Sequence, residues 1–200
     1  LAAASENILP YLDLPLQHGV NRLIRKMGRR PPARDLLVWL ENIRASLPGA
    51  VLRTTFMVGY PTESEDEFET LLEFIGQARF DHLGAFTFWP EEGVRAAALP
   101  GQVPQRLAQE RLERLMALQA EISLANNRAW EGRRVDVLVE GRHPESDLLL
   151  TGRAWFQAPE VDGSIIIRSG AGHPGRIQPA RIVEAHTYDL VAELEEEPPK

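Results

Sequence analysis

The sequence contains no cysteine among its 200 residues. Without a thiol, the chain forms no disulfide, uses no thiolate nucleophile and holds no iron-sulfur cluster through its own cysteines. It also lacks a long apolar run, because none approaches the roughly 20 residues of a membrane-spanning helix. The first residues have neither the basic segment nor the long apolar segment of a signal peptide. We therefore expect a cytoplasmic location without membrane contact.

Positive charge is scarce as well. The net charge of -7 disfavours a large nucleic-acid footprint, because a basic surface is needed to bind the phosphate backbone. From Arg133 onward, 8 Lys and Arg residues stand against 12 Asp and Glu residues, a net charge of -4. Since like charges repel, this part of the chain suits a basic protein partner better than RNA.

The segment 51–58 is a short β-branched and aromatic run bounded by turn residues, which predicts a buried strand. After it, Gly59 lets the backbone approach a ligand closely, and Pro61 fixes a turn. Thr62 or Ser64 then caps a helix. The segment is either an ordinary strand-to-helix connection or part of a site at the carboxyl edge of a sheet, and its residues alone favour neither.

A hydrophobic content of 44% is enough for a packed core and for one or two domains. The apolar pattern predicts two further strands, over 8–16 and 80–88, and helices over 33–46 and 65–77. Because the strands alternate with helices, we expect an α/β fold whose strands are parallel and joined by right-handed crossovers.

The pattern changes beyond residue 102. A long charged helix over 104–130 is expected to join two domains. Short strands and glycine-rich turns then predict an OB-like antiparallel β-barrel of roughly 60 to 70 residues. Its predicted strands are 135–140, 148–154, 164–168 and 175–185. We therefore expect two domains, residues 1–131 and residues 132–200.

Five short motifs occur in order along the chain. They are 11–18 (YLDLPLQH), 27–30 (MGRR), 53–63 (RTTFMVGYPTE), 80–86 (FDHLGAF) and 89–93 (WPEEG). Together they resemble the radical S-adenosylmethionine methylthiotransferases, and five weak motifs in order make a strong signal. The C-terminal barrel resembles the TRAM domain of that family. Residues 158–163 (APEVDG) and 185–190 (AHTYDL) resemble the branch that modifies an aspartate of a small-subunit ribosomal protein. The tRNA-modifying branch is the close alternative.

The resemblance implies an architecture. Residues 1–131 would be half of a partial (β/α)6 radical-SAM barrel, its strands four to six, and residues 132–200 would be a TRAM barrel that binds the substrate. It further implies that the chain is monomeric and that its partner is a basic small-subunit ribosomal protein.

The resemblance also implies a chemistry and its cofactors, S-adenosylmethionine and two 4Fe-4S clusters in the whole protein. One cluster cleaves S-adenosylmethionine to a deoxyadenosyl radical, which removes a hydrogen from the β-carbon of the target aspartate; the second cluster helps to supply sulfur. In the family the cluster cysteines precede the strands present here. We therefore expect them upstream of Leu1, and we expect no turnover from these 200 residues alone.

Gln17 and His18 end the first predicted strand, at the edge where parallel barrels place their active sites. A histidine there more often caps a turn than binds a ligand, but the resemblance places both residues in the cofactor site. Asp13 alternates with leucines inside this strand. It points either into the barrel cavity, as a substrate contact, or toward an arginine.

Arg29 and Arg30 belong to a basic cluster whose simplest role is a solvated helix face. A guanidinium also holds a carboxylate bidentately, so we expect both residues in substrate binding, with Arg29 bound to a carboxylate of the substrate or the cofactor. Trp89, at the end of the third strand, belongs either to the core or to the substrate entrance.

The resemblance implies five more cofactor contacts. They are Thr54, Thr55, Gly59, Tyr60 and Pro61. The two threonines would act through their hydroxyls, although ordinary strand threonines look the same in sequence. The other three resemble a glycine-proline turn beside the adenine, where the backbone makes the contacts. Thr62 stands where this family commonly has glycine.

The histidines are scattered without metal-ligand spacing, so no metal site is expected within the chain. Two other functions stay open. The first is methylthiolation of a tRNA adenosine, and the second is a non-catalytic module that binds protein or RNA.

Overall fold

The computed structural model describes residues 7–30 and 35–195. They form two compact units, the first over Pro10–Ile122 and the second over residues 7–9 and 123–195. The domain boundary at residues 131 and 132 stays a prediction, and the outer ends of both predicted domains lie outside the described residues. Within the described part, no helix combines the length and the apolar composition needed to cross a membrane.

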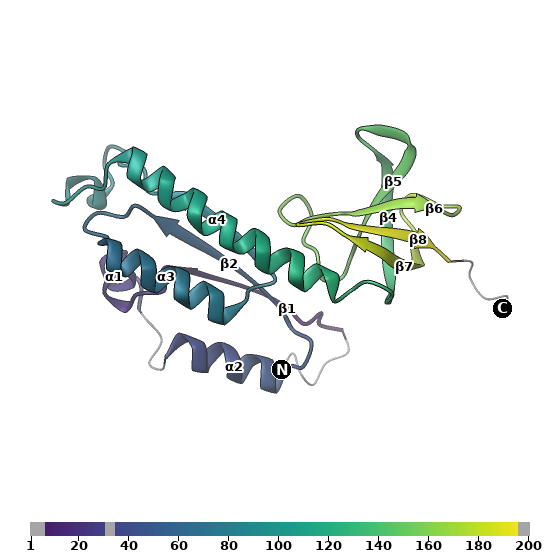
Figure 1. The fold of residues 1–200 in the computed structure, drawn as a ribbon, viewed down its shortest axis with the longest axis horizontal. Coiled ribbons are helices and arrows are strands. Elements are labelled where there is room, and N and C mark those ends of the chain that lie inside the picture. The colour runs from purple at the N-terminus through teal and green to yellow at the C-terminus, as the bar shows by residue number, and fades with distance from the viewer. Residues whose placement is uncertain (1–6, 31–34, 196–200) are drawn as a thin grey trace. The chain divides into compact units, whose positions relative to one another are not determined.

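The first unit is built on a three-stranded parallel sheet in the order β1-β2-β3; Figure 1 labels β1 and β2. Its strands are β1 (Tyr11–Gln17), β2 (Val51–Val58) and β3 (His82–Thr87). Helices α1 (Asn21–Lys26) and α2 (Leu36–Ser46) follow β1, and α3 (Glu65–Ala78) follows β2. The 3-10 helix η2 (Arg95–Ala98) and the helix α4 (Gln105–Arg128) follow β3. The expected parallel α/β arrangement is confirmed.

The alternation of side chains along β2 gives the sheet two different faces. Leu52, Phe56 and Val58 are fully buried and pack with apolar residues of α2, α3 and α4. Fully burying an aliphatic or aromatic side chain contributes roughly 1.5 to 3 kcal/mol, so this covered face holds the first unit together. Residues 53, 55 and 57 lie on the opposite face, called here the open face, and are only partly buried.

Helix α3 begins where its sequence predicts. The Ser64 side chain accepts a hydrogen bond from the Glu67 backbone N–H at 3.2 Å, and the Glu67 carboxylate accepts one from the Ser64 backbone N–H at 3.1 Å. This capping box satisfies two N–H groups that the helix itself leaves unpaired. Of the two candidate caps, Ser64 is the one that the structure uses.

The second unit contains a closed barrel with the strand order β4-β5-β6-β8-β7 (Figure 1). The strands are β4 (Arg134–His143), β5 (Ser146–Ala154), β6 (Ile165–Ser169), β7 (Ile177–Ala185) and β8 (Leu190–Leu194). Four of the expected strands are present, but β8 was not predicted. Because β8 runs parallel to β6 and antiparallel to β7, the barrel is mixed rather than antiparallel.

Candidate functional site

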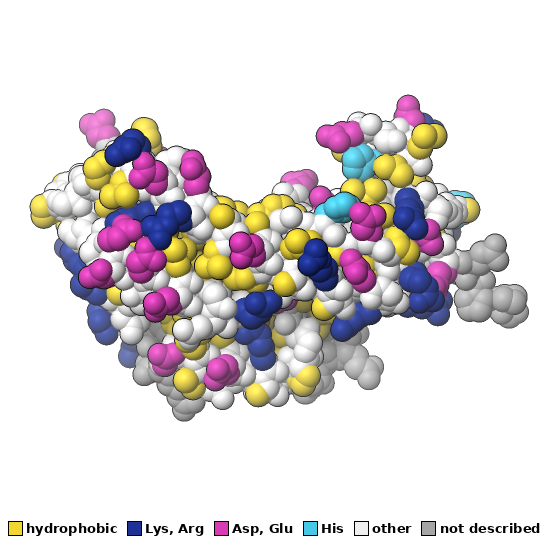
Figure 2. Space-filling view, viewed as in Figure 1, with side chains coloured by type: hydrophobic (Ala, Val, Ile, Leu, Met, Phe, Trp, Pro, Cys, Tyr) yellow, Lys and Arg dark blue, Asp and Glu magenta, His cyan; other side chains and the backbone are white. Residues whose placement is uncertain are grey.

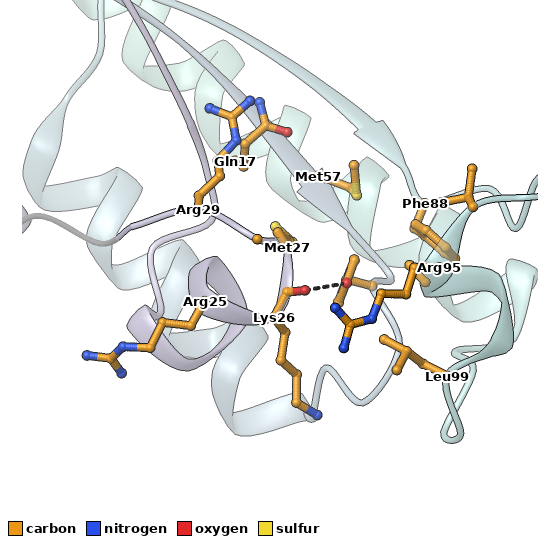
Figure 3. A pocket seen from close by; sticks show the side chains of 13 residues that line it. Gln17, Arg25, Lys26, Met27, Arg29, Met57, Phe88, Arg95 and Leu99 are labelled. Carbon is orange, nitrogen blue, oxygen red and sulfur yellow. Dashed lines mark hydrogen bonds between the residues drawn. The ribbon is translucent and has the colours of Figure 1, made fainter.

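A cavity of about 560 Å³ opens at the carboxyl ends of the parallel strands of the first unit (Figure 3). We call it the strand-end pocket. Its lining residues come from the ends of β1 and β2, from the end of α1 and the segment after it, from the segment after β3, and from η2 and the residue after it. They are Gln17, Arg25, Lys26, Met27, Gly28, Arg29, Met57, Tyr60, Phe88, Val94, Arg95, Ala96 and Leu99. Open α/β sheets place ligands at this edge.

Four of these lining residues are cationic, and none is acidic. Lys26 Nζ donates to Thr62 Oγ1 at 2.7 Å, and Arg29 Nη1 donates to the Pro15 carbonyl at 3.0 Å. The side chains of Arg25 and Arg95 make no hydrogen bond or ion pair within the described part of the chain. In a chain with a net charge of -7, this concentration of positive charge suits a ligand that carries carboxylate or phosphate groups.

The remaining wall of the pocket is apolar. Figure 3 shows Met57 and Phe88 on the side opposite Arg25, whose guanidinium points away from them. The buried Tyr60 ring lies edge-on to Phe88, with 5.3 Å between ring centroids, and its hydroxyl donates to the Lys26 carbonyl at 2.9 Å. Burial raises the pKa of Tyr60, and the charge of Arg95 partly offsets this, so the phenol stays protonated at neutral pH. A flat apolar group such as a purine fits against this wall.

A tight turn joins β2 to α3 behind the pocket. Gly59 has a φ of +74°, and a Cβ added there would lie 2.4 Å from the Ala108 Cβ, so α4 packs directly on its backbone. Pro61 and Thr62 occupy the corner, and the Glu63 N–H donates to the Tyr60 carbonyl at 2.9 Å. Thr62 adopts a φ of +72°, the conformation that glycine favours in a type II turn. Its N–H donates to the Gly101 carbonyl at 2.7 Å, which holds the strained residue in place.

Beneath this turn lie three buried charged or titratable side chains, His18, Glu63 and Arg111. Glu63 Oε1 accepts from Arg111 Nη1 at 3.1 Å, and Glu63 Oε2 accepts from the Tyr60 N–H at 3.1 Å. Burial raises the pKa of the Glu63 carboxyl to about 6, although Arg111 and the N–H groups of Tyr60 and Gly59 oppose that rise. Glu63 is therefore ionised at pH 7.

His18 is neutral at the same pH, because burial lowers the pKa of its imidazole to about 4. Its Nδ1 accepts a hydrogen bond from the Val20 N–H at 3.0 Å, so the proton of the neutral ring belongs on Nε2. Nε2 lies 4.0 Å from Glu63 Oε2 and has no hydrogen-bond partner within the described residues. His18 therefore anchors the start of α1 from behind the pocket.

The open face of the sheet adjoins the pocket and carries its own polar groups. Asp13 and Arg53 face each other on neighbouring strands and form an ion pair of 2.9 Å. His82 on β3 is the register partner of Arg53 on β2, and 6.2 Å separate the centroids of the His82 and Tyr11 rings. Of the two roles considered for Asp13, pairing with an arginine is therefore observed.

The structure brings together only some of the predicted site residues. Gln17, Arg29 and Tyr60 line the strand-end pocket. Thr55 and Asp13 lie on the open face beside it. These five residues are compatible with ligand contact.

The other predicted residues are placed differently. Thr54 lies on the covered face, is fully buried and donates its hydroxyl to the Leu14 carbonyl at 2.8 Å, so we do not retain it as a cofactor contact. His18 is buried as well, and Gly59 and Pro61 lie within the turn. Arg30 and Trp89 are exposed and are not among the lining residues of the pocket.

Sequence reasoning did not identify Arg95 or the pair of Glu63 and Arg111. Arg95 was expected in a loop, where a single arginine carries no signal. Glu63 looked like an ordinary acidic residue near a helix start, and its partner is 48 residues away. A carboxylate just after a glycine-proline turn was the only available hint.

The apolar wall of the pocket suits the adenine of S-adenosylmethionine, and its cations suit the carboxylate of that ligand; its sulfonium and ammonium groups find no acidic partner among the lining residues. They do not fit an iron-sulfur cluster, since the chain has no cysteine. Within the described ranges, no group of three His, Cys, Asp or Glu side chains could hold a metal ion.

Comparison with known proteins supplies two findings. Residues 132–194 match the family model of the TRAM domain. The chain is also similar to curated proteins named ribosomal protein uS12 methylthiotransferase RimO. It is 48% identical to that of Syntrophobacter fumaroxidans over 95% of this chain and 42% of the relative. It is 50% identical to that of Synechococcus sp. strain RCC307, over 97% of this chain and 41% of the relative. The chain thus spans about two fifths of the length of these relatives.

Proposed function

Because the chain is similar along almost its whole length to curated proteins named ribosomal protein uS12 methylthiotransferase, we propose that it forms part of an enzyme that methylthiolates the β-carbon of an aspartate in that small-subunit ribosomal protein. The observation that carries this proposal is the identity of 42 to 50% along almost the whole chain. Such similarity includes both the strand-end pocket and the TRAM barrel.

We propose that the strand-end pocket holds S-adenosylmethionine and admits the target aspartate. When bound and reductively cleaved, S-adenosylmethionine supplies the radical that removes the hydrogen from the target carbon. Arg29 would bind a carboxylate through the N–H groups that its bond to Pro15 leaves available. Tyr60 and Phe88 would hold the adenine and exclude water. Gln17 would donate to, or accept from, a polar group of the ligand at the end of β1.

The iron-sulfur clusters need ligands that these 200 residues do not supply, since the chain has no cysteine. We therefore propose that the chain alone is inactive and that the two 4Fe-4S clusters are bound elsewhere in the complete enzyme.

The proposed macromolecular partner is a basic ribosomal protein, bound by the TRAM barrel. The residues from Arg133 onward carry a net charge of -4, which disfavours a polyanion. On the face drawn in Figure 2, acidic side chains are interspersed among the basic ones of the second unit. On this face, no continuous basic stripe of the kind that would favour tRNA is seen.

Two experiments test the proposal. The complete enzyme that contains this chain is incubated with S-adenosylmethionine, sulfide, a reductant and either purified uS12 or tRNA, and the products are analysed by mass spectrometry. A methylthiolated aspartate in uS12 is expected, whereas modification of a tRNA adenosine would contradict the assignment. In a binding assay, this chain should retain uS12 and should bind tRNA weakly at low salt. A chain that retained neither would contradict the proposed substrate-binding role of the barrel.

A further inference from the structure

We propose that Glu63 is a positioning residue of the strand-end pocket and acts through Tyr60. The contacts of Glu63 in the turn do not depend on the proposed function, whereas the choice of ligand for the test rests on it. The proposal comes from the contacts of the turn, in which one buried carboxylate holds the backbone that presents the Tyr60 ring to the pocket.

The Glu63 carboxylate folds back on its own turn. Its Oε2 accepts the Tyr60 N–H at 3.1 Å, and the nearby Gly59 N–H helps to lower the pKa of the same carboxyl. The Glu63 N–H meanwhile donates to the Tyr60 carbonyl at 2.9 Å. The peptide groups on both sides of the Tyr60 Cα are therefore fixed by a single residue, and the direction in which the ring leaves the backbone is fixed with them.

Arg111 keeps this carboxylate in place. Its Nη1 donates to both Glu63 Oε1 and the Glu63 carbonyl, each at 3.1 Å. Both side chains are almost completely buried. Rotation of the buried Glu63 carboxylate would leave further buried polar groups unpaired, so it has few alternative orientations. The Arg111 Nε already lacks a hydrogen-bond partner within the described residues. The carboxylate is therefore a rigid acceptor for the Tyr60 N–H and stays close to the Gly59 N–H.

Tyr60 connects the turn to two sides of the pocket. Its ring packs edge-on against Phe88 at the end of β3, and its hydroxyl donates to the Lys26 carbonyl at the end of α1. Lys26 belongs to the segment that also carries Arg25 and Arg29. Through one ring, Glu63 thus fixes the apolar wall of the pocket relative to its cationic side.

The chain offers a matched control in Glu65. Its Oε2 accepts from Arg111 Nη2 at 2.9 Å, so it pairs with the same guanidinium as Glu63. Glu65 is half-exposed, and none of its described hydrogen bonds involves the turn. Comparing the two residues separates the positioning of the turn from the simple pairing of Arg111.

The experiment compares the unmodified chain with Glu63→Gln and Glu65→Gln. Hydrogen exchange is measured at the Gly59 and Tyr60 amides, and binding of S-adenosylhomocysteine is measured by titration and corrected for the folded fraction. In Glu63→Gln we expect these two amides to exchange about 10-fold faster relative to the β2 amides, and affinity to fall about 10-fold, as expected from one lost charge-assisted hydrogen bond. Glu65→Gln should change neither quantity.

Tyr60→Phe tests the hydrogen bond from the Tyr60 hydroxyl to the Lys26 carbonyl. It should weaken S-adenosylhomocysteine binding without accelerating the Gly59 amide. If Glu63→Gln does not fold, Glu63→Asp, which keeps the charge but shortens the side chain, takes its place in both measurements and decides the question. The proposal is overturned if Glu63→Gln lowers stability while affinity per folded molecule and the two amide rates match those of Glu65→Gln. If the unmodified chain binds no S-adenosylhomocysteine, the proposed cofactor site fails. The amide rates of Glu63→Gln then still decide whether Glu63 holds the turn.

Discussion

The buried pair of His18 and Glu63 should give the first unit two opposing responses to acid. Glu63 has its pKa raised from 4.5 to about 6, so the folded state binds its proton more tightly than the unfolded state. Its contribution to stability is complete below pH 4.5 and is lost as the pH rises through 6. His18 has its pKa lowered from 6.5 to about 4. Its contribution is present above pH 6.5 and is lost as the pH falls through 4.

The magnitudes follow from about 1.4 kcal/mol per pKa unit. Acidification from pH 7 to pH 4 should gain roughly 2 kcal/mol from Glu63 and lose roughly 3 kcal/mol from His18. The two partly cancel in the unmodified chain and leave a net loss of roughly 1 kcal/mol. In Glu63→Gln the loss from His18 is uncompensated, whereas in His18→Asn only the gain from Glu63 is left. Asparagine can still accept the Val20 N–H, which makes it the conservative replacement.

The assay is hydrogen exchange at the slowest amides of β2, which reports on the first unit alone. The free energy of opening is measured at pH 7, 5.5 and 4 for the three proteins. Other carboxyl groups respond to pH as well, but they are common to all three and cancel in the differences. Glu63→Gln should lose about 2 kcal/mol more than the unmodified chain over this range, and His18→Asn about 3 kcal/mol less. Three parallel curves would refute the reasoning.

Three further predictions concern the turn and the helix that follows it. Gly59→Ala should destabilise the first unit by more than about 2 kcal/mol in the same exchange assay, because it adds both backbone strain and overlap with Ala108; Ala108→Gly should recover only the overlap, and full recovery would show that the φ of +74° costs nothing. Thr62→Gly should be about 1 kcal/mol more stable than Thr62→Ala, because both lose the hydroxyl and only glycine relaxes the positive φ. Urea titration, followed by the NMR resonances of residues in the first unit, checks this order. Ser64→Ala should cost about 1 kcal/mol by removing one acceptor of the capping box, and no change in the exchange of the first turn of α3 would contradict that role.

Much of the first unit could be predicted from its sequence because its strands and helices have distinct apolar periods. The two-residue alternation of side chains along a strand also places Thr54 and Thr55 on opposite faces of the sheet. Thr54 has the parity of Leu52, Phe56 and Val58, so the bulky apolar residues already indicated that it faces the core. Only Thr55 has the parity of the open face.

The strand-end pocket was harder to predict because it depends on distant pairs. Glu63 is fixed by Arg111, and Tyr60 by Lys26, over separations of 48 and 34 residues. No local pattern encodes such pairs. Strand β8 was missed for a related reason: it is five residues long, and its place between β6 and β7 comes from pairing rather than from its own composition.

The position of β8 also determines which strand edges of the barrel stay unpaired before β8 docks. Without β8, the strands β6, β5, β4 and β7 form a four-stranded sheet with β6 and β7 as its two free edges. Insertion of β8 joins both edges at once, parallel to β6 and antiparallel to β7. In any state in which residues 190–194 are not docked, the other four strands therefore expose two unpaired edges that can template aggregation. Docking of β8 therefore removes both free strand edges of the barrel, through which copies of the chain could otherwise pair.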